Sequence, residues 1–489
     1  MRIVFRVDGG HGRGMGHLIR CLALAEQFKA YGSTAMFLTR EQPAVLKAIQ
    51  AAGYPYAVLS STATLEEDLH FTLEKSGHAS ILIADSYHFS SDYLRRLNAE
   101  YRLVVAFDDL IDRFLPVDLI LGNVYVSRDS YGSYLPKETI LLAGPTYLPL
   151  RPCLQNLSPK QIIPQFNRIL VTFGGEDPQN YTEAVIKALQ EYPRPLKLEI
   201  ILGPAYTFTN QCEAALAQSK HTYQIYPNPP AIVSLFQSAD LAIATPSCTF
   251  WELLATGTPS LLIKIAANQT SIEMYAQEKQ LAICTSLPNL CKTLQTYEDP
   301  EIRSQYSQRA QAFVDGRGAR RSVEAILTRY LEKAQIKLKQ ADPDPESSDS
   351  HLFWEWRNDP LTRAMSKQTE WIPWETHRAW YAAAASNPHI HMRIAMENSH
   401  PVGAFRLEND QQGDAIVSIN VSPEFRGHGK GKQILELGCL IGFLKLRCDT
   451  LTAAIKKDNL VSKNLFMDLG FKLVEEGSAF DTYVKTIYS

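Results

Sequence analysis

The chain has 489 residues, enough for about three ordinary domains of roughly 150 residues each. Its hydrophobic content of 45%, charged content of 21% and formal charge of -3 are those of a globular protein and exclude a disordered or polybasic chain, so we expect no nucleic-acid partner. No cysteine pair has the C-x-x-C spacing and no apolar run approaches the roughly 18 residues of a membrane span, so we predict no metal site, no disulfide framework, no membrane association and a cytoplasmic location.

The first predicted element is a short strand that runs through a glycine-rich loop into a helix. The apolar run at residues 2–7 is too short for a helix, whereas the residues after His17 have a helical period. Gly14 and Gly16 let the backbone approach an anion at the helix start, and His17 can move a proton near neutral pH. His17 is therefore our first candidate for a catalytic residue. A structural turn with an incidental histidine is the alternative.

Strands then alternate with helices, which predicts a parallel sheet with helices on both faces. Asp85 and Asp108 follow two of these strands, and the carboxyl ends of strands border the ligand crevice in such sheets. Tyr87 lies close to Asp85, although an ordinary half-buried aromatic residue is the alternative there. The expected strands cover residues 34–38, 79–84 and 103–107.

A second lobe of the same make-up begins after a proline-rich connection. Its first strand runs into Gly174 and Gly175, which repeats the strand, glycine loop and helix of the chain's start. Further on, Ser247 or Thr249 caps a helix that carries Glu252 in its first turn. A purely structural Glu252 is the alternative to a binding role, because the helix dipole alone favours a carboxylate there.

A third module follows a solvated segment in which two prolines lie among acidic and serine residues. Five of the six tryptophans lie within residues 354–380 of this module. The sequence therefore predicts an α/β chain of two Rossmann-like lobes followed by an α+β domain. The expected boundaries are residues 1–155 for the first lobe, 156–340 for the second lobe with its trailing helices, 341–350 for the linker and 351–489 for the last domain.

The last domain contains a pattern that is built to hold a pyrophosphate between a strand and a helix. In Arg426-x-x-Gly429-x-Gly431 the glycines expose successive backbone N–H groups, and the helix dipole adds to their field. Together with the strand and helix around Asn459, this pattern resembles the acetyl-CoA site of the GNAT-superfamily acetyltransferases across residues 350–489. The resemblance implies acetyl-CoA as cosubstrate. It places Arg426, Gly427, Gly429, Gly431 and Lys432 at the pyrophosphate and Asn459 near the pantetheine.

Within that superfamily, the segment from Glu355 to Pro360 and the pair His377 and Trp380 are similar to enzymes that acetylate the 4-amino group of a UDP-linked amino sugar. One position departs from the superfamily pattern. Phe466 stands where a tyrosine often protonates the leaving thiolate, so another residue or water does that work, or the activity of the domain is altered. The sequence does not assign the acceptor of the amine proton.

The two lobes carry a second resemblance, over about residues 1–290. Its features, in order, are Asp8, the glycine loop with His17, Asp85-x-Tyr87, Phe107-Asp-Asp109, Gly174-Gly175-x-Asp177, Ser247 with Glu252, and Asn268-Gln269. This series resembles the UDP-sugar hydrolases of pseudaminic acid biosynthesis, relatives of the two-lobed GT-B glycosyltransferases. The resemblance implies hydrolysis of UDP-2,4-diacetamido-2,4,6-trideoxy-β-L-altropyranose to UDP and the free sugar.

The same resemblance implies roles for individual residues. His17 activates water near the anomeric carbon, Asp8 orients His17 or a sugar hydroxyl, and Tyr87 orients sugar or water. In the second lobe, Glu252 meets the ribose hydroxyls, while backbone and hydroxyl donors meet the diphosphate. The implied substrate-binding residues are Gly14, Gly16, Gly174, Gly175, Ser247, Glu252, Asn268 and Gln269.

Both resemblances point to one pathway, so we expect a bifunctional enzyme that acts on UDP-linked amino sugars. Direct passage of the intermediate between the two sites is a separate hypothesis, because a linker raises local concentration without requiring a channel. The alternative is a GT-B-like glycosyltransferase that passes the sugar to an acceptor hydroxyl, fused to a domain that only binds or senses acetyl-CoA.

Overall fold

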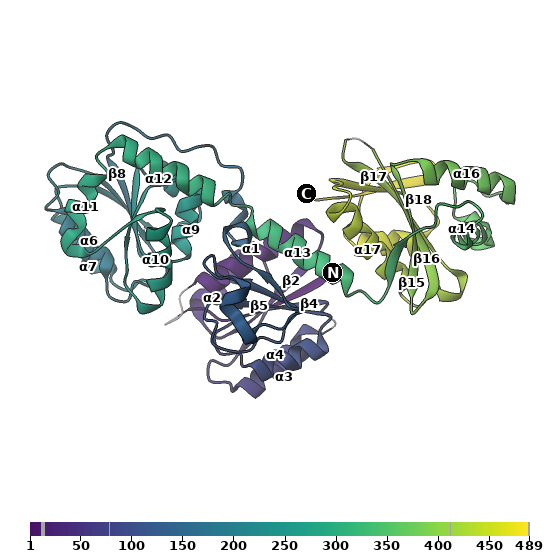
Figure 1. Ribbon diagram of the computed structural model, residues 1–489, viewed down its shortest axis with the longest axis horizontal. Coiled ribbons are helices and arrows are strands. Elements are labelled where there is room, and N and C mark those ends of the chain that lie inside the picture. The colour runs from purple at the N-terminus through teal and green to yellow at the C-terminus, as the bar shows by residue number, and fades with distance from the viewer. Residues whose placement is uncertain (11–14, 78, 411, 488–489) are drawn as a thin grey trace. The chain divides into compact units, whose positions relative to one another are not determined.

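The computed structural model describes residues 1–10, 15–77, 79–410 and 412–487 (Figure 1). By its contacts, the chain divides into two compact units. One comprises Arg2–Gln27 and Ala35–Val323 and holds two parallel sheets. The other comprises Glu324–Ser489 with Met1 and Phe28–Thr34 and holds a mixed sheet.

The first parallel sheet has seven strands. They are β1 (Arg2–Val7), β2 (Thr34–Arg40), β3 (Tyr56–Leu59), β4 (Ile81–Asp85), β5 (Leu103–Asp108), β6 (Leu119–Gly122) and β7 (Ile140–Leu142), in the order β3-β2-β1-β4-β5-β6-β7. The helices of this lobe are α1 (Gly16–Ala30), α2 (Pro43–Ala51), α3 (Leu65–Ser76), α4 (Ser91–Glu100) and α5 (Arg128–Tyr131). Figure 1 shows α1 and α2 on one face of the sheet and α3 and α4 on the other. The central strands β1, β4 and β5 are mostly apolar because both of their faces are buried, and their buried charged residues are Arg6, Asp85 and Asp108.

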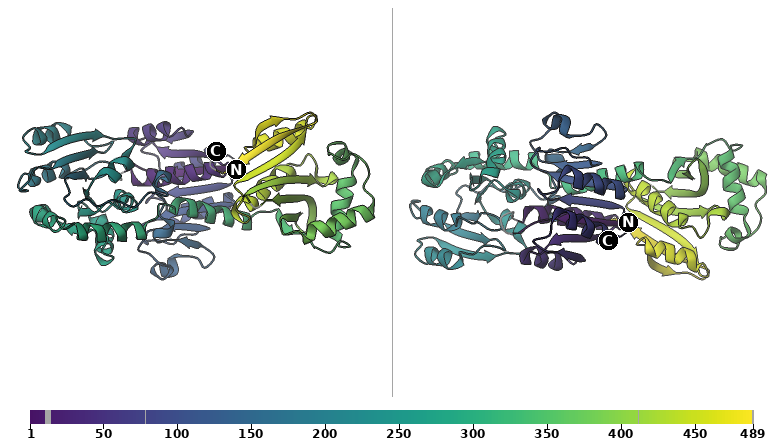
Figure 2. Two further views of the ribbon diagram at one scale, coloured as in Figure 1. Left: turned by 90° about the horizontal axis from the view of Figure 1, so that it is seen from above. Right: turned by 90° about the horizontal axis from the view of Figure 1, so that it is seen from below.

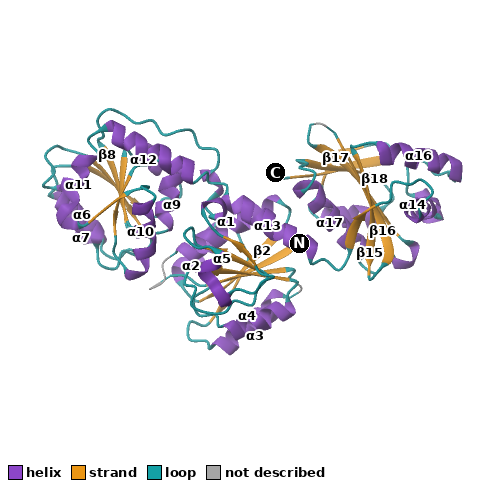
Figure 3. Ribbon diagram, viewed as in Figure 1, coloured by secondary structure: helices purple, strands orange, loops and turns teal. Residues whose placement is uncertain are grey.

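The second parallel sheet has six strands. They are β8 (Arg168–Thr172), β9 (Lys197–Leu202), β10 (Thr222–Pro227), β11 (Leu241–Ala244), β12 (Ser260–Ile263) and β13 (Ile283–Thr285), in the order β10-β9-β8-β11-β12-β13. Its helices are α6 (Tyr181–Leu189), α7 (Thr209–Ala217), α8 (Ile232–Ser238), α9 (Cys248–Ala255), α10 (Thr270–Glu278), α11 (Leu290–Thr296) and α12 (Pro300–Phe313), and α13 (Gly318–Glu332) follows them. Two apolar clusters, one on each face, hold these helices to the sheet, and Figure 3 shows the strands between the helical layers.

The mixed sheet has seven strands in the order β14-β15-β16-β17-β18-β20-β19. They are β14 (Lys337–Gln340), β15 (Ile390–Glu397), β16 (His400–Asn409), β17 (Asp414–Val421), β18 (Thr450–Lys456), β19 (Lys472–Glu476) and β20 (Phe480–Thr486). The helices are α14 (Ser348–Asn358), α15 (Pro360–Ala364), α16 (Trp374–Ser386), α17 (Lys430–Leu444) and α18 (Leu460–Asp468). All neighbouring strands run antiparallel except β17 and β18, which are parallel.

The parallel pair β17 and β18 stays together only at its start. Pairing covers Asp414 to Ile416 and Thr450 to Thr452, and the strands then separate. Figure 2 shows the yellow C-terminal strands diverging from the green ones. The rest of β17 therefore leaves backbone groups on its β18 side unpaired within the sheet, where an extended ligand can pair with them.

These sheets confirm the predicted fold class of two Rossmann-like lobes followed by an α+β domain. The strand β14 pairs with β15 of the mixed sheet. It lies before the domain boundary that we predicted at residue 351, in the segment that we assigned to the trailing helices of the second lobe. Ile336 and Leu338 alternate with lysines over too few residues to distinguish a strand, so the pairing with β15 decides the structure of this segment. Within the described ranges, we find no helix that is both long and apolar enough to cross a membrane.

Candidate functional site

The residue His17 lies at the switch point of the first sheet. There β1 and β4 are neighbours, while β2 lies beyond β1 and β5 lies beyond β4. Gly16 and His17 begin α1 after β1, and Asp85 ends β4, whereas the predicted Gly14 lies outside the described residues. Ligands of doubly wound sheets bind in the crevice at such a point, which supports a site around His17.

The buried ring of His17 is bonded to a carboxylate. Its Nδ1 lies 2.5 Å from Asp85 Oδ1, and Arg20 donates to both oxygens of Asp85 through Nη2 and Nε, each at 2.7 Å. Burial alone would raise the pKa of Asp85, but the nearby Arg20 and His17 outweigh burial and hold that pKa well below its ordinary value. Asp85 is therefore an ionised acceptor that favours a proton on Nδ1, which leaves Nε2 as the basic nitrogen of the ring.

A second carboxylate, Asp109, lies on the other side of Arg20. Its two oxygens accept hydrogen bonds from Arg20 Nη1 and Nη2 at 3.0 and 2.9 Å. The Tyr87 hydroxyl donates to Asp109 Oδ2 at 3.1 Å, and the Tyr87 ring meets the His17 ring edge-on, with centroids 4.7 Å apart. The structure thus brings together two predicted residues, His17 and Tyr87, around a cluster of two carboxylates and one arginine.

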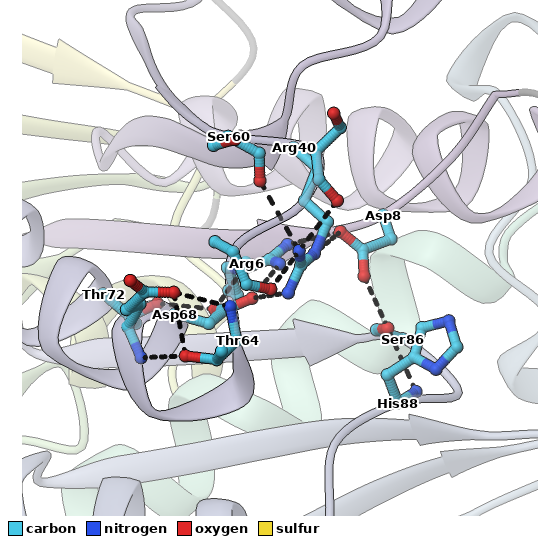
Figure 4. Close-up of polar contacts among 12 residues, drawn as sticks. Arg6, Asp8, Arg40, Ser60, Thr64, Asp68, Thr72, Ser86 and His88 are labelled. Atoms are coloured by element: carbon cyan, nitrogen blue, oxygen red, sulfur yellow. Dashed lines mark hydrogen bonds and ion pairs between the residues drawn. The ribbon is translucent and has the colours of Figure 1, made fainter.

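The carboxylate of Asp8 lies in a neighbouring buried network (Figure 4). Its oxygens accept hydrogen bonds from Arg6 Nη1 at 2.8 Å and from Ser86 Oγ at 2.6 Å. Ser86 Oγ accepts in turn from the backbone N–H of His88 at 3.2 Å. These bonds fix the loop on both sides of Tyr87, so Asp8 supports the position of Tyr87. A direct role of Asp8 toward His17 or a sugar hydroxyl stays a prediction.

In the second lobe, the glycine loop follows β8 at the switch point beside β11. Gly174 has a φ of 81°, in the left-handed region that favours glycine. Gly203, after β9, packs so closely on this loop that a Cβ atom there would collide with the Gly174 carbonyl. Because Gly174 and Gly175 have no side chains to cover the backbone, an anion can reach their N–H groups.

The helix α9 starts at the end of the neighbouring strand. Ser247 is its N-cap residue, but the Ser247 hydroxyl makes no capping bond and, among the described residues, is a buried oxygen without a hydrogen-bond partner. Leaving such a group unpaired costs about 1–3 kcal/mol. The first N–H groups of α9 also lack partners within the helix, so this hydroxyl and the helix start can together receive an anion.

The buried carboxylate of Glu252 already has a partner. Its Oε1 accepts a hydrogen bond from Arg151 Nε at 2.8 Å. Burial raises the pKa of Glu252, and the charge of Arg151 partly offsets this. The predicted contact with ribose hydroxyls therefore requires Glu252 to share its oxygens between Arg151 and the nucleotide.

The predicted residues Asn268 and Gln269 lie in a turn at Ala267–Gln269. The carboxamide oxygen of Gln269 accepts hydrogen bonds from Thr245 Oγ1 and Ile265 N at 2.7 and 2.9 Å, which ties two loops of the lobe together. The side chain of Asn268 lies outside the described part of the chain. Substrate contacts by either residue stay predictions.

In the last domain, the glycine loop leads from β17 into α17. Gly427 and Gly429 have φ values of 79° and 72°, in the left-handed region that favours glycine. No described atom lies within 4 Å of a Cβ atom built at either position, so the backbone conformation, and not a lack of space, requires glycine there. Gly431 is tighter, because a Cβ atom there would lie 3.3 Å from Val421 Cγ2. The loop follows the part of β17 that has left β18, so the glycine loop and the separated strands are adjacent along the chain.

The basic residues around this loop are paired with carboxylates. The pairs are Arg426 with Asp359 at 2.8 Å, Lys430 with Glu397 at 2.6 Å and Lys432 with Asp468 at 3.1 Å. These carboxylates largely balance the positive charge of the three basic residues. The backbone N–H groups of the loop, aided by the α17 dipole, are then the main groups that can receive a pyrophosphate.

Two further positions of this domain have local structural roles. The Asn459 side chain accepts a hydrogen bond from Ser462 N at 3.1 Å and thereby caps α18. Its position near the pantetheine stays a prediction. Phe466 is buried against Phe471, with ring centroids 4.8 Å apart, and offers no proton to a thiolate.

Sequence reasoning gave no role to three residues, Asp85, Arg20 and Asp109, although all three lie in the motifs that carry the resemblance. A signal existed, because both aspartates directly follow or end strands, and Arg20 lies one helical turn after His17. Which carboxylate reaches Nδ1 depends on which strands are neighbours. The distance along the chain favours Asp8 over Asp85, whereas the adjacency of β1 and β4 places Asp85 against the ring.

Within the described ranges, we find no group of three or more histidine, cysteine or acidic side chains that could hold a metal ion. Residues 350–471 match the acetyltransferase (GNAT) family, and this match supports acetyl-CoA as a cosubstrate of the last domain.

Three relatives match longer parts of the chain. It is 23% identical to the uncharacterised protein MJ1062 of Methanocaldococcus jannaschii, over 98% of each protein. It is 24% identical to the spore coat polysaccharide biosynthesis protein SpsG of Bacillus subtilis, over 68% of this chain and 99% of SpsG. It is 26% identical to a pseudaminic acid cytidylyltransferase and UDP-2,4-diacetamido-2,4,6-trideoxy-β-L-altropyranose hydrolase of Helicobacter pylori, over 53% of this chain and 47% of that protein. These matches and the GNAT domain support an enzyme with a role in a sugar-nucleotide pathway.

Proposed function

We propose that the two lobes hydrolyse UDP-2,4-diacetamido-2,4,6-trideoxy-β-L-altropyranose to UDP and the free sugar. The observation that carries this proposal is the bond between His17 Nδ1 and Asp85 at the switch point of the first sheet, because it prepares Nε2 to act as a base. Similarity to a relative whose name states this hydrolase activity supports the choice of substrate.

The proposed reaction needs one base and one held leaving group. His17 Nε2 takes a proton from water while the water oxygen bonds to the anomeric carbon, and the bond from that carbon to the diphosphate oxygen breaks with its electrons going to UDP. The loop of Gly174 and Gly175 and the Ser247 hydroxyl stabilise the charge that develops on the diphosphate. Glu252 contacts the ribose.

The test is an incubation of the purified chain with the acetylated UDP-sugar and no acceptor. We expect UDP and free sugar to appear together in equal amounts. Unchanged substrate would overturn the hydrolase proposal, and UDP release only after an acceptor is added would identify a glycosyltransferase.

For the last domain, we propose N-acetylation of the 4-amino group of the precursor UDP-sugar by acetyl-CoA. The separation of β17 from β18 and the glycine loop before α17 support an extended acetyl-CoA site. Because Phe466 has no proton to give, water or another residue protonates the departing thiolate. We expect acetyl-CoA turnover that depends on the 4-amino sugar nucleotide. A domain that binds acetyl-CoA without this turnover would be a sensor.

A further inference from the structure

We propose that Asp109 is a positioning residue for the base: it competes with Nδ1 of His17 for the hydrogens of Arg20 and holds the Tyr87 hydroxyl beside the ring. This inference rests on the proposed hydrolase function. Among the described residues, Asp109 reaches the ring through Arg20 and Tyr87, while its third partner, Asn123, donates to Oδ1 at 3.5 Å.

The first argument concerns the direction of hydrogen bonds. Arg20 Nη2 lies 3.2 Å from His17 Nδ1, and an arginine nitrogen can only donate. When Nδ1 carries the proton that Asp85 accepts, Arg20 and Nδ1 are two donors facing each other. The two hydrogens of Arg20 Nη2 face three acceptors, which are Asp85 Oδ1, Asp109 Oδ2 and His17 Nδ1, so Asp109 competes with Nδ1 for them. Without Asp109, one of these hydrogens is left to Nδ1, which moves the ring proton to Nε2 and removes the base.

The second argument concerns charge. Asp85 and Asp109 carry two negative charges against the single positive charge of Arg20, so the cluster is at -1 while His17 is neutral and reaches zero when His17 takes a proton. If Asp109 were neutral, the same proton would give the buried cluster a charge of +1, which a low-dielectric site disfavours. Asp109 therefore makes His17 a better proton acceptor.

The other titratable groups that face the cluster do not change this balance near pH 7. Burial and the charge of Asp109 raise the pKa of the Tyr87 hydroxyl. Desolvation raises the pKa of the Cys21 thiol on α1 well above its ordinary value and that of the Cys248 thiol on α9 to about 11. All three groups stay neutral, so the proton balance lies among Asp85, Asp109, Arg20 and His17.

The test compares Asp109→Asn with Asn123→Ala, which removes a partner of Asp109 but leaves the charge of Asp109. Two readouts are used on the full chain: the pH dependence of kcat/KM for UDP release, and the ¹⁵N spectrum of the His17 ring, assigned with His17→Gln. For Asp109→Asn we expect the acidic limb of the pH profile to move down by about one pH unit and the ring to shift toward the Nε2–H tautomer. Asn123→Ala should change neither.

Two more variants keep the test decisive if Asp109→Asn folds poorly. Asp109→Glu restores the charge and should return both readouts to those of the wild type. Arg20→Gln removes the positive charge and should move the acidic limb in the opposite direction, to higher pH. A wild-type limb and tautomer in a folded Asp109→Asn, or equal shifts in the Asn and Glu variants, would overturn the proposal. If the wild type releases no UDP, the hydrolase proposal fails, while the ¹⁵N readout still decides the role of Asp109.

Discussion

The two parallel sheets present opposite chemistry at equivalent positions. At the switch point of the first sheet, His17, Arg20 and two aspartates already satisfy one another with bonds of 2.5 to 3.0 Å. At the switch point of the second sheet, the Ser247 hydroxyl is buried without a partner among the described residues, and Gly174 and Gly175 have no side chains of their own over the loop backbone. The polar side chains of the first site are bonded to one another, whereas the second site has donors that are available to a ligand.

This difference fits the roles that we propose for the two sites. A general base needs a fixed tautomer and orientation before substrate arrives, so its neighbours must be bonded in the free protein. A diphosphate brings its own acceptors, so donors that receive it are best left unpaired at a modest cost in stability. The comparison predicts that variants of the first lobe affect rate and those of the second affect affinity.

The largest effect is expected for His17→Ala. Losing the base should lower the rate of UDP release about 100-fold to 10,000-fold, while UDP affinity measured by calorimetry stays that of the wild type. The matched control is His88→Ala, an exposed histidine near the same strand end, which should keep full activity. A fully active His17→Ala would end the general-base role, and a loss of UDP affinity in that variant would break the division between the lobes.

A smaller effect is expected for the stability of Asp85→Asn. Since the folded-state pKa of Asp85 is depressed, its charge stabilises the fold fully above its unfolded-state pKa of about 4, and this stabilisation is lost as the pH falls below that value. Chemical denaturation at pH 7 should show a loss of about 3 kcal/mol in the variant, and the difference from the wild type should shrink toward pH 3. A difference that does not depend on pH would contradict an ionised Asp85.

The smallest effect is expected for Ser247→Ala. Loss of one hydrogen bond to a charged ligand should weaken UDP binding about tenfold, without loss of stability, because the variant also removes an unpaired buried hydroxyl. Ser260→Ala is the matched control in the same lobe. Its buried hydroxyl bonds to the Thr258 carbonyl at 2.9 Å, so that variant should lose stability and keep UDP affinity. The reverse pattern would show that Ser247 has only a structural role.

The sequence was sufficient for the fold class and for the glycine loops after β8 and β17, because strand period, helix period and glycine placement are local signals, but it missed β14. It was sufficient for His17 and Tyr87 as candidates, although it could not show that their rings meet. It missed the partner of His17 because Asp85 is 68 residues away along the chain and reaches the ring only through the pairing of β1 with β4.

The last domain shows the same limit. In the sequence, Arg426, Lys430 and Lys432 flank a glycine loop and can supply positive charge to a pyrophosphate. Their carboxylate partners come from distant segments, at residues 359, 397 and 468, and no local pattern links them to the loop. Only the folded chain shows that backbone donors, and not free positive charges, remain for a pyrophosphate.

The most direct test of the central claim follows the fate of the water oxygen. The reaction is run in H₂¹⁸O with the acetylated UDP-sugar, and the released UDP is analysed by mass spectrometry. If His17 delivers water to the sugar carbon while the second lobe holds the diphosphate, UDP carries no ¹⁸O. UDP that contains ¹⁸O would show attack at phosphorus and would contradict the account.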